Sequence, residues 1–130
     1  MTNTSPKTMK GRAMFQDITG LDANAFEAQF AGPAAKFPIY AFDWEFADLV
    51  GNSSLDDRSR ELVAVASMAS LGATAAPVLQ LRIACARRAG ISQQEIMDIF
   101  LQIGLAAGLP AALAAIKIAQ GVFAQETAID

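Results

Sequence analysis

One uncharged segment of the chain runs from Ile99 to Ile116 and holds 18 consecutive residues without a charged side chain. At this length an apolar segment becomes a candidate for a membrane-spanning helix. The segment is rich in alanine and glycine, however, and Gly108-Leu109-Pro110 is typical of one helix ending and another beginning. Each half is too short to cross a bilayer. The segment therefore predicts two buried helices joined by a tight turn, and no membrane association.

Helix start signals recur along the rest of the chain. Ser92 and Glu95 have the spacing of a capping box, in which each side chain binds the backbone N–H of the other residue. Asp56 or Asp57 can cap an earlier helix, because an acidic side chain accepts hydrogen bonds from the first turn and suits the helix dipole. Glycine or proline follows most of the expected helix ends. These signals predict helices over approximately the ranges 22–30, 38–50, 56–71, 77–89, 92–107 and 110–125.

No segment shows the strict alternation of apolar and polar residues that is typical of a strand. The sequence therefore predicts an all-α fold, with a single domain of about six helices over residues 21–130. The length of 130 residues is below the size at which chains normally split into several domains. Residues 1–20 are polar and show no apolar period, which predicts a flexible N-terminal arm.

Two expectations concern burial. Aromatic residues crowd the segment 38–50, so this helix is expected to be buried on more than one side, with Tyr40 and Trp44 in the core or at an interface. The last helix is expected to direct Leu113, Ile116 and Phe123 inward.

Hydrophobic residues make up 53% of the chain and charged residues only 18%. A small domain with so few charges has more apolar surface than it can hide alone, which predicts a homo-oligomer. The net charge of -3 argues against a nucleic-acid partner, because such proteins carry a basic surface. The polar start of the chain lacks the apolar core of a signal peptide, and the chain has one cysteine; both favour a cytoplasmic location.

The chain contains no histidine. This excludes Ser-His-Asp and Cys-His catalysis and any imidazole metal site. The single cysteine excludes an intrachain disulfide and a CxxC pair for redox chemistry or zinc. The sequence therefore predicts neither a metal site nor a cofactor.

Four short segments follow one another between Leu55 and Phe123. They read Leu55-Asp56-Asp57-Arg58-Ser59-Arg60-Glu61-Leu62, Ala69-Ser70-Leu71-Gly72, Ala89-Gly90-Ile91-Ser92-Gln93-Gln94-Glu95-Ile96 and Gly108-Leu109-Pro110-Ala111-Ala112-Leu113. In order and spacing they resemble the carboxymuconolactone decarboxylase family, part of the alkyl-hydroperoxidase-D-like superfamily. The resemblance implies a helical bundle that assembles as a homotrimer or homohexamer.

The resemblance also implies a reaction, the removal of CO₂ from a small carboxylated lactone during the breakdown of aromatic compounds. Peroxidase members of the superfamily use a CxxC pair before a histidine, and the corresponding positions here are Ala75, Val78 and Arg82. Peroxidase activity is therefore not expected. The decarboxylase branch keeps that histidine, here Arg82, and has a tyrosine where this chain has Ala106.

Because both pocket residues are replaced, two functions stay open. The first is a cofactor-free lyase or isomerase acting on a small carboxylated lactone or another intermediate of aromatic-compound breakdown. The alternative is a catalytically silent oligomeric protein of the same fold that binds a ligand or serves as a scaffold.

Glu61 matches the pocket glutamate of the resembled family and is predicted to be a general acid or base. Its alternative role is that of a first-turn carboxylate that pairs with Arg58 or Arg60. Arg82 is predicted to bind the carboxylate of a small anionic substrate or to pair with Glu61, because a guanidinium can hold a carboxylate but cannot shuttle a proton. Its alternative is to extend from an apolar stripe into solvent.

Two further residues bear on the candidate site. Gln102 places an amide in an apolar helix, where it needs a partner from the backbone, another subunit or a ligand; it is predicted to bind substrate. Cys85 is expected to be a small core residue and not a reactive thiol.

Overall fold

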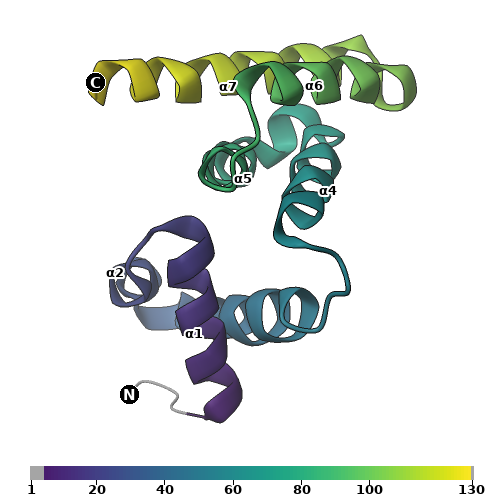
Figure 1. Cartoon of the computed structure of the whole chain (residues 1–130). Helices are drawn as coiled ribbons and strands as arrows, with labels where there is room; N and C mark the ends of the chain where they lie inside the picture. Colours follow the sequence, from purple (N-terminus) through teal and green to yellow (C-terminus); the bar gives the residue numbers. More distant parts are fainter. Residues whose placement is uncertain (1–4, 130) are drawn as a thin grey trace. The chain divides into compact units, whose positions relative to one another are not determined.

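The computed structural model describes residues 5–129, and within that range the chain is helical and contains no strand (Figure 1). The predicted all-α fold is confirmed. The α-helices of this range are α1 (Pro6–Thr19), α2 (Ala23–Ala28), α3 (Lys36–Tyr40), α4 (Asp57–Ala69), α5 (Ala76–Arg88), α6 (Gln93–Ala107) and α7 (Leu109–Ile129). Three further helical segments are η1 (Gly32–Ala34), the π-helix η2 (Ala41–Val50) and η3 (Gly72–Ala75).

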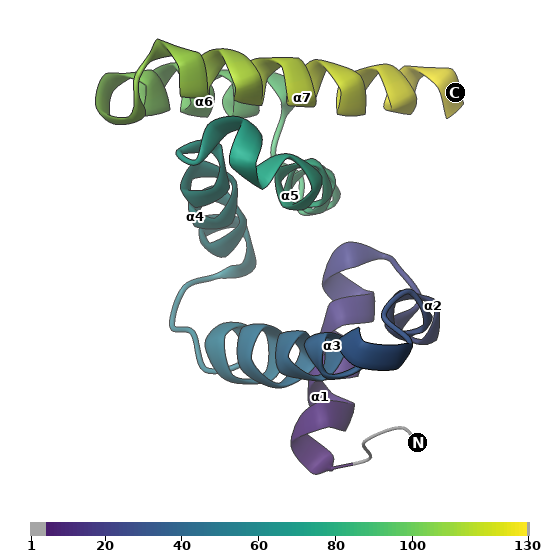
Figure 2. The same ribbon diagram turned by 180° about the vertical axis from the view of Figure 1, so that it is seen from behind.

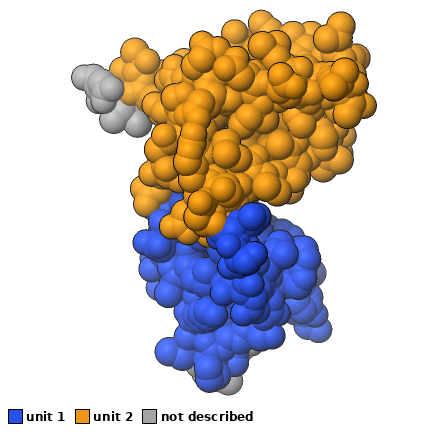
Figure 3. Space-filling model, turned by 45° about the vertical axis from the view of Figure 1, so that its right-hand side comes forward, with its two compact units in different colours: residues 1–55 blue, residues 56–130 orange. Residues whose placement is uncertain are grey.

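The chain forms two compact units, residues 1–55 and residues 56–130 (Figure 3). In the first unit α1 packs on η2, and Phe15 of α1 contacts Phe42 and Phe46 of η2 edge to face. Gly11 lies where α1 meets the backbone of η2: a Cβ atom on Gly11 would be 1.9 Å from the carbonyl oxygen of Phe42. Only glycine allows the two helices to approach so closely.

Helix α1 occupies most of the segment for which a flexible arm was expected. Ser5 caps it by accepting a hydrogen bond from the Thr8 N–H (3.1 Å), and Gly20 ends it with a φ of 74°. The remaining residues of the expected arm, 1–4, lie outside the described range. The prediction failed because α1 turns mostly small or polar residues toward η2, so that Phe15 is the one large apolar side chain that it buries fully.

The helix formed by α3 and η2 is buried on one side. Phe42 and Phe46 lie in the core, whereas Tyr40 and Trp44 are each 64% exposed. The expected burial on more than one side is therefore not found within this chain.

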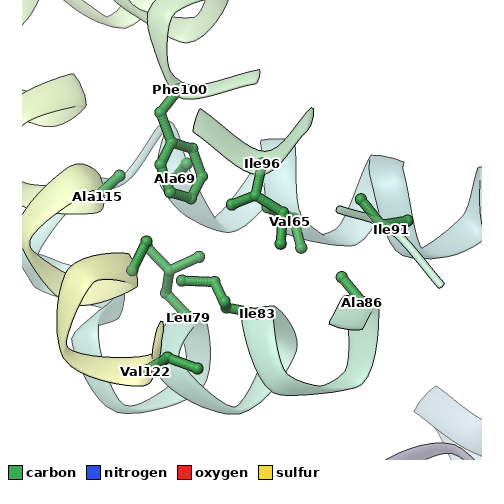
Figure 4. Packing of buried hydrophobic residues seen from close by; sticks show 11 residues of the cluster. Val65, Ala69, Leu79, Ile83, Ala86, Ile91, Ile96, Phe100, Ala115 and Val122 are labelled. Carbon is green, nitrogen blue, oxygen red and sulfur yellow. The ribbon is translucent and has the colours of Figure 1, made fainter. Parts of the chain in front are cut away.

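The second unit has a core built by α4, α5, α6 and α7 (Figure 4). Helices α6 and α7 form an antiparallel hairpin, which turns at Gly108 with a φ of 92° (Figures 1 and 2). The buried side chains of this core come from all four helices and from the loop before α6: Val65, Ala69, Leu79, Ile83, Ala86, Ile91, Ile96, Phe100, Ala115, Ala119 and Val122.

Helix α7 differs from expectation in the residues that it buries. Leu113 was expected to face inward but is 58% exposed, while Ile116 and Phe123 are half-buried. Small residues of α7, including Ala115 and Ala119, face the core in their place. Alanine lets α7 approach the other helices closely, and this leaves its leucines outside.

The capping box before α6 is present as predicted. The Ser92 side chain accepts a hydrogen bond from the Glu95 N–H, and the Glu95 carboxylate accepts one from the Ser92 N–H, both at 3.0 Å. Because Ser92 satisfies an N–H that otherwise has no partner in the helix, Ser92→Ala is expected to lower the free energy of unfolding by about 1 kcal/mol in urea titrations. Ser92→Gly is the control and is expected to lower the free energy of unfolding by only a few tenths of a kcal/mol. An unchanged stability of Ser92→Ala would show that the cap is dispensable.

None of the helices in the described part of the chain combines the length and the hydropathy needed to span a bilayer. The break at Gly108, which the sequence indicated, divides the uncharged segment between α6 and α7.

Candidate functional site

Among the described residues of the second unit, Glu61 is the most deeply buried acidic side chain. It lies in the second turn of α4, which begins after Asp56, whose side chain accepts a hydrogen bond from the Ser59 N–H (2.7 Å). Only 1% of the Glu61 surface is exposed. Neither carboxylate oxygen accepts a hydrogen bond. A buried carboxylate in this state is costly, which marks this position as a candidate site.

Two guanidinium groups flank the Glu61 carboxylate. Arg82 of α5, also buried, places Nη1 3.9 Å from Oε2, and Arg60 of α4 places Nη2 3.6 Å from Oε1. Both distances exceed hydrogen-bond length, so the contacts are electrostatic. Arg60 is itself held by Asp57, whose Oδ1 lies 3.0 Å from its Nη1. We call Glu61, Arg82 and Arg60 the carboxylate cluster.

Burial raises the pKa of Glu61 above its usual value, because it removes water from the charged form. The positive charges of Arg82 and Arg60 act in the opposite direction but are outweighed. The carboxyl group therefore retains its proton to a higher pH than an exposed glutamate does. A carboxyl group in this condition can serve as a general acid.

Two of the three predicted site residues are thus brought together, Glu61 and Arg82. The charged groups of Glu61 and Arg82 are 3.9 Å apart, which is too far for a hydrogen-bonded ion pair. Both side chains are buried. Arg82 does not extend into solvent, since it is only 7% exposed. Arg60 was considered only in the alternative in which Glu61 is a first-turn carboxylate that pairs with Arg58 or Arg60, and the structure places Arg60 beside Glu61.

Gln102, the third predicted residue, lies elsewhere in the second unit. It is exposed on α6 and lines an open groove of about 590 Å³ between α4 and α6. Ala106, at the position where the resemblance implies a tyrosine, lines the same groove. Neither Glu61 nor Arg82 lines it. The other residues of the groove are Leu62, Val63, Ala66, Glu95, Asp98, Ile99 and Ile103.

Cys85 is buried in α5 with 1% of its surface exposed, as expected for a core residue. Over the residues that the structure describes, no three cysteine, aspartate or glutamate side chains gather into a cluster that could hold a metal ion.

Comparison with known proteins agrees with this architecture. Residues 37–121, which are 85 of the 130 residues, match the model of the carboxymuconolactone decarboxylase family. A segment of 89 residues is 33% identical to an uncharacterized 15.0 kDa protein in the nqo9-nqo10 intergenic region of Paracoccus denitrificans. That match covers 68% of this chain and 66% of the relative, just under two thirds of its length. With four helices packed around one core and a family match over most of the second unit, the chain belongs to the carboxymuconolactone decarboxylase family.

Proposed function

We propose that this protein is an acid–base lyase or isomerase that acts on a small carboxylated lactone or a related intermediate of aromatic-compound breakdown. One observation carries the proposal: Glu61 is buried beside two guanidinium groups, and its carboxylate oxygens accept no hydrogen bond. In this proposal Glu61 transfers the proton and Arg82 binds a substrate carboxylate. The proposal requires neither a metal nor a cofactor, and it places the protein in the cytoplasm.

The decarboxylation can be written with these groups alone. The bond between the ring carbon and the departing carboxylate breaks, CO₂ leaves, and the electron pair moves into the conjugated lactone as an enolate. The protonated carboxyl of Glu61 then donates its proton to a ring carbon of this enolate. The carboxylate of Glu61 that results regains a proton from water. The net change is the release of one CO₂ and the uptake of one proton.

The guanidinium groups have a separate part in this scheme. A substrate such as 4-carboxymuconolactone has two carboxylates. Arg82 can bind one of them through two parallel hydrogen bonds while the other is lost as CO₂. The positive charges of Arg82 and Arg60 favour the enolate over the neutral lactone.

The test is the loss of 4-carboxymuconolactone in the presence of the purified protein. We expect Glu61→Gln to lower kcat by a factor of about 10² to 10⁴, because a glutamine cannot donate the proton. Arg82→Ala is expected to abolish turnover. The matched control is Glu126→Gln, since Glu126 pairs with Arg87 outside the cluster, and it is expected to retain full activity. Turnover by Glu61→Gln at the wild-type rate would contradict the assignment.

The alternative, a silent binding or scaffold protein, is favoured by Arg82 and Ala106, which stand where the resembled enzymes have a histidine and a tyrosine. Wild-type protein that gives no turnover but is stabilised by lactone acids in a thermal-shift experiment would support this alternative. Loss of that stabilisation in Arg82→Ala would then identify the cluster as the binding site.

A further inference from the structure

A hollow of about 350 Å³ lies on the second unit, between the start of α5 and the second half of α7. Its volume is within the range of sites that hold small molecules. It shares no residue with the carboxylate cluster or with the groove between α4 and α6. The residues that line it include Ala76, Pro77 and Gln80 of α5 and Lys117, Gly121 and Gln125 of α7.

The hollow adjoins the packed core of this unit. Leu79 of α5 and Val122 of α7 are core residues, and their neighbours in the chain, Gln80 and Gly121, line the hollow (Figure 4). At Gly121 an added Cβ atom would meet no atom within 4 Å. The glycine therefore leaves open space on this face of α7.

Three polar side chains border this open space. Lys117 and Gln125 lie four residues before and four residues after Gly121, so all three are on the same side of α7. Gln80 borders the hollow from α5. None of the three polar side chains makes a hydrogen bond or an ion pair with another residue in the range 5–129. Their donors are therefore available to a ligand.

Lys117 brings a positive charge to the hollow without a carboxylate to balance it. It is the one charged residue between Leu109 and Gln125. The nearest carboxylate along α7 belongs to Glu126, which is bonded to Arg87 (2.8 Å) and to Gln93 (3.1 Å). The ammonium group therefore favours an anion as the occupant of the hollow.

We propose that the hollow binds a small organic molecule with one carboxylate and an apolar body. The single charge of Lys117 matches a single carboxylate, and the ammonium group can donate hydrogen bonds to its oxygens. The side-chain amides of Gln80 and Gln125 can donate further hydrogen bonds to the same oxygens. Together these groups hold the charged end of the ligand.

The other walls of the hollow select for the apolar body. Pro77 of α5 and Ile118 and Val122 of α7 contribute apolar side chains to the lining. An apolar lining with a few polar groups is typical of small-molecule sites. Inorganic phosphate would leave these apolar walls unused. The proposal is independent of the proposed catalytic function, because the hollow and the carboxylate cluster have no residue in common.

A titration of the isotope-labelled full-length protein with benzoate tests the proposal by NMR. We expect the side-chain amide signals of Gln80 and Gln125 to shift together, with one Kd on the order of 1 mM. Benzyl alcohol has the ring without the carboxylate, and inorganic phosphate has charge without the apolar body. Each is expected to bind at least tenfold more weakly than benzoate, because each lacks one of the two interactions.

Three variants locate the binding. Lys117→Gln is expected to raise the Kd for benzoate at least tenfold, because it removes a hydrogen bond to a charged group. Gly121→Leu keeps the lysine but fills the open space, and it is expected to weaken binding by a similar factor. Lys36→Gln is the matched control, since it removes the same charge from an exposed position of the first unit, and it is expected to bind benzoate as wild-type protein does.

Folding should be preserved in these variants, because Lys117, Gly121 and Lys36 are exposed, and far-UV circular dichroism checks this. Unchanged signals of Gln80 and Gln125 at about 10 mM benzoate, roughly ten times the expected Kd, would overturn the proposal. A wild-type Kd in folded Lys117→Gln would also overturn it. Equal affinity for phosphate and benzoate would show that the hollow selects charge alone, which contradicts the assignment of an apolar carboxylate.

Discussion

Replacing Glu61 by glutamine is expected to remove a pH-dependent free-energy cost from the folded protein. Burial raises the pKa of Glu61 in the folded state above its usual value of 4.5. The folded state therefore favours the protonated carboxyl. Compared with Glu61→Gln, the wild-type protein should be most stable below about pH 4.5 and lose stability as the pH rises through the raised pKa. Between the pKa of Glu61 in the unfolded chain and its raised pKa in the folded protein, each pH unit changes the difference in unfolding free energy between wild-type protein and Glu61→Gln by about 1.4 kcal/mol.

Urea midpoints of wild-type protein and Glu61→Gln between pH 4 and pH 8 measure this difference. Glu95 provides a comparison in which the change of stability with pH has the opposite sign. The hydrogen bond from the Ser92 backbone lowers the pKa of Glu95, so its contribution is present at neutral pH and lost as the pH falls through the lowered pKa. As the pH rises, wild-type protein should thus gain stability relative to Glu95→Gln but lose stability relative to Glu61→Gln. A constant difference for Glu61→Gln would mean that the carboxyl group is not desolvated.

Gly11→Ala is expected to lower the free energy of unfolding of the first unit by about 3 kcal/mol. The added methyl group would lie 1.9 Å from the Phe42 carbonyl oxygen and 2.5 Å from its carbon, and these backbone atoms cannot rotate away as a side chain can. To accept the methyl group, α1 must move off η2, which opens the packing of Phe15 against Phe42 and Phe46. The gain in helix propensity, about 1 kcal/mol, is too small to offset this loss.

The single tryptophan of the chain, Trp44, lies in η2 and reports on this unit by its fluorescence in urea. Gly121→Ala is the matched control. Gly121 is exposed within α7, and an added methyl group would meet no atom within 4 Å. This change should stabilise α7 by up to about 1 kcal/mol. If Gly11→Ala also stabilised the protein, the close approach of α1 and η2 would be refuted.

The helices that the sequence predicted best are those with a capping residue at the start or a glycine at the end. Asp22, Asp56 and Ser92 each cap the helix that follows, and glycine closes α5 and α6 where expected. Capping is local, since it involves a side chain and an N–H two or three residues away, so it can be recognised without knowledge of the tertiary structure.

Tertiary packing decided the features that the sequence did not predict. Helix α1 depends on a glycine that lets it touch η2, and such a contact leaves no apolar period. In α7 both leucines and alanines were available for the core, and the close packing of helices selected the alanines. Hydrophobic periodicity assigns the larger side chains to the core, so Leu113 was predicted to be buried.

The candidate site was partly predictable for a related reason. The resemblance to the family placed Glu61 and Arg82 in one pocket, and the structure brings them within 3.9 Å. Gln102 was chosen because an amide in an apolar helix needs a partner. That argument cannot tell which face of α6 the residue occupies, and the structure places it in the groove instead.

The burial of Cys85 makes the wild-type chain its own probe of local opening. Cys85 is the only thiol, and with 1% of its surface exposed it can meet a thiol reagent only when α5 separates from its neighbours. The labelling rate of native protein therefore measures how often the packing around Cys85 opens, without an engineered reporter. Arg82 lies one helical turn before Cys85 on α5. A change in the labelling rate of Cys85 in the variant Arg82→Ala therefore measures how much the carboxylate cluster contributes to the packing of this helix.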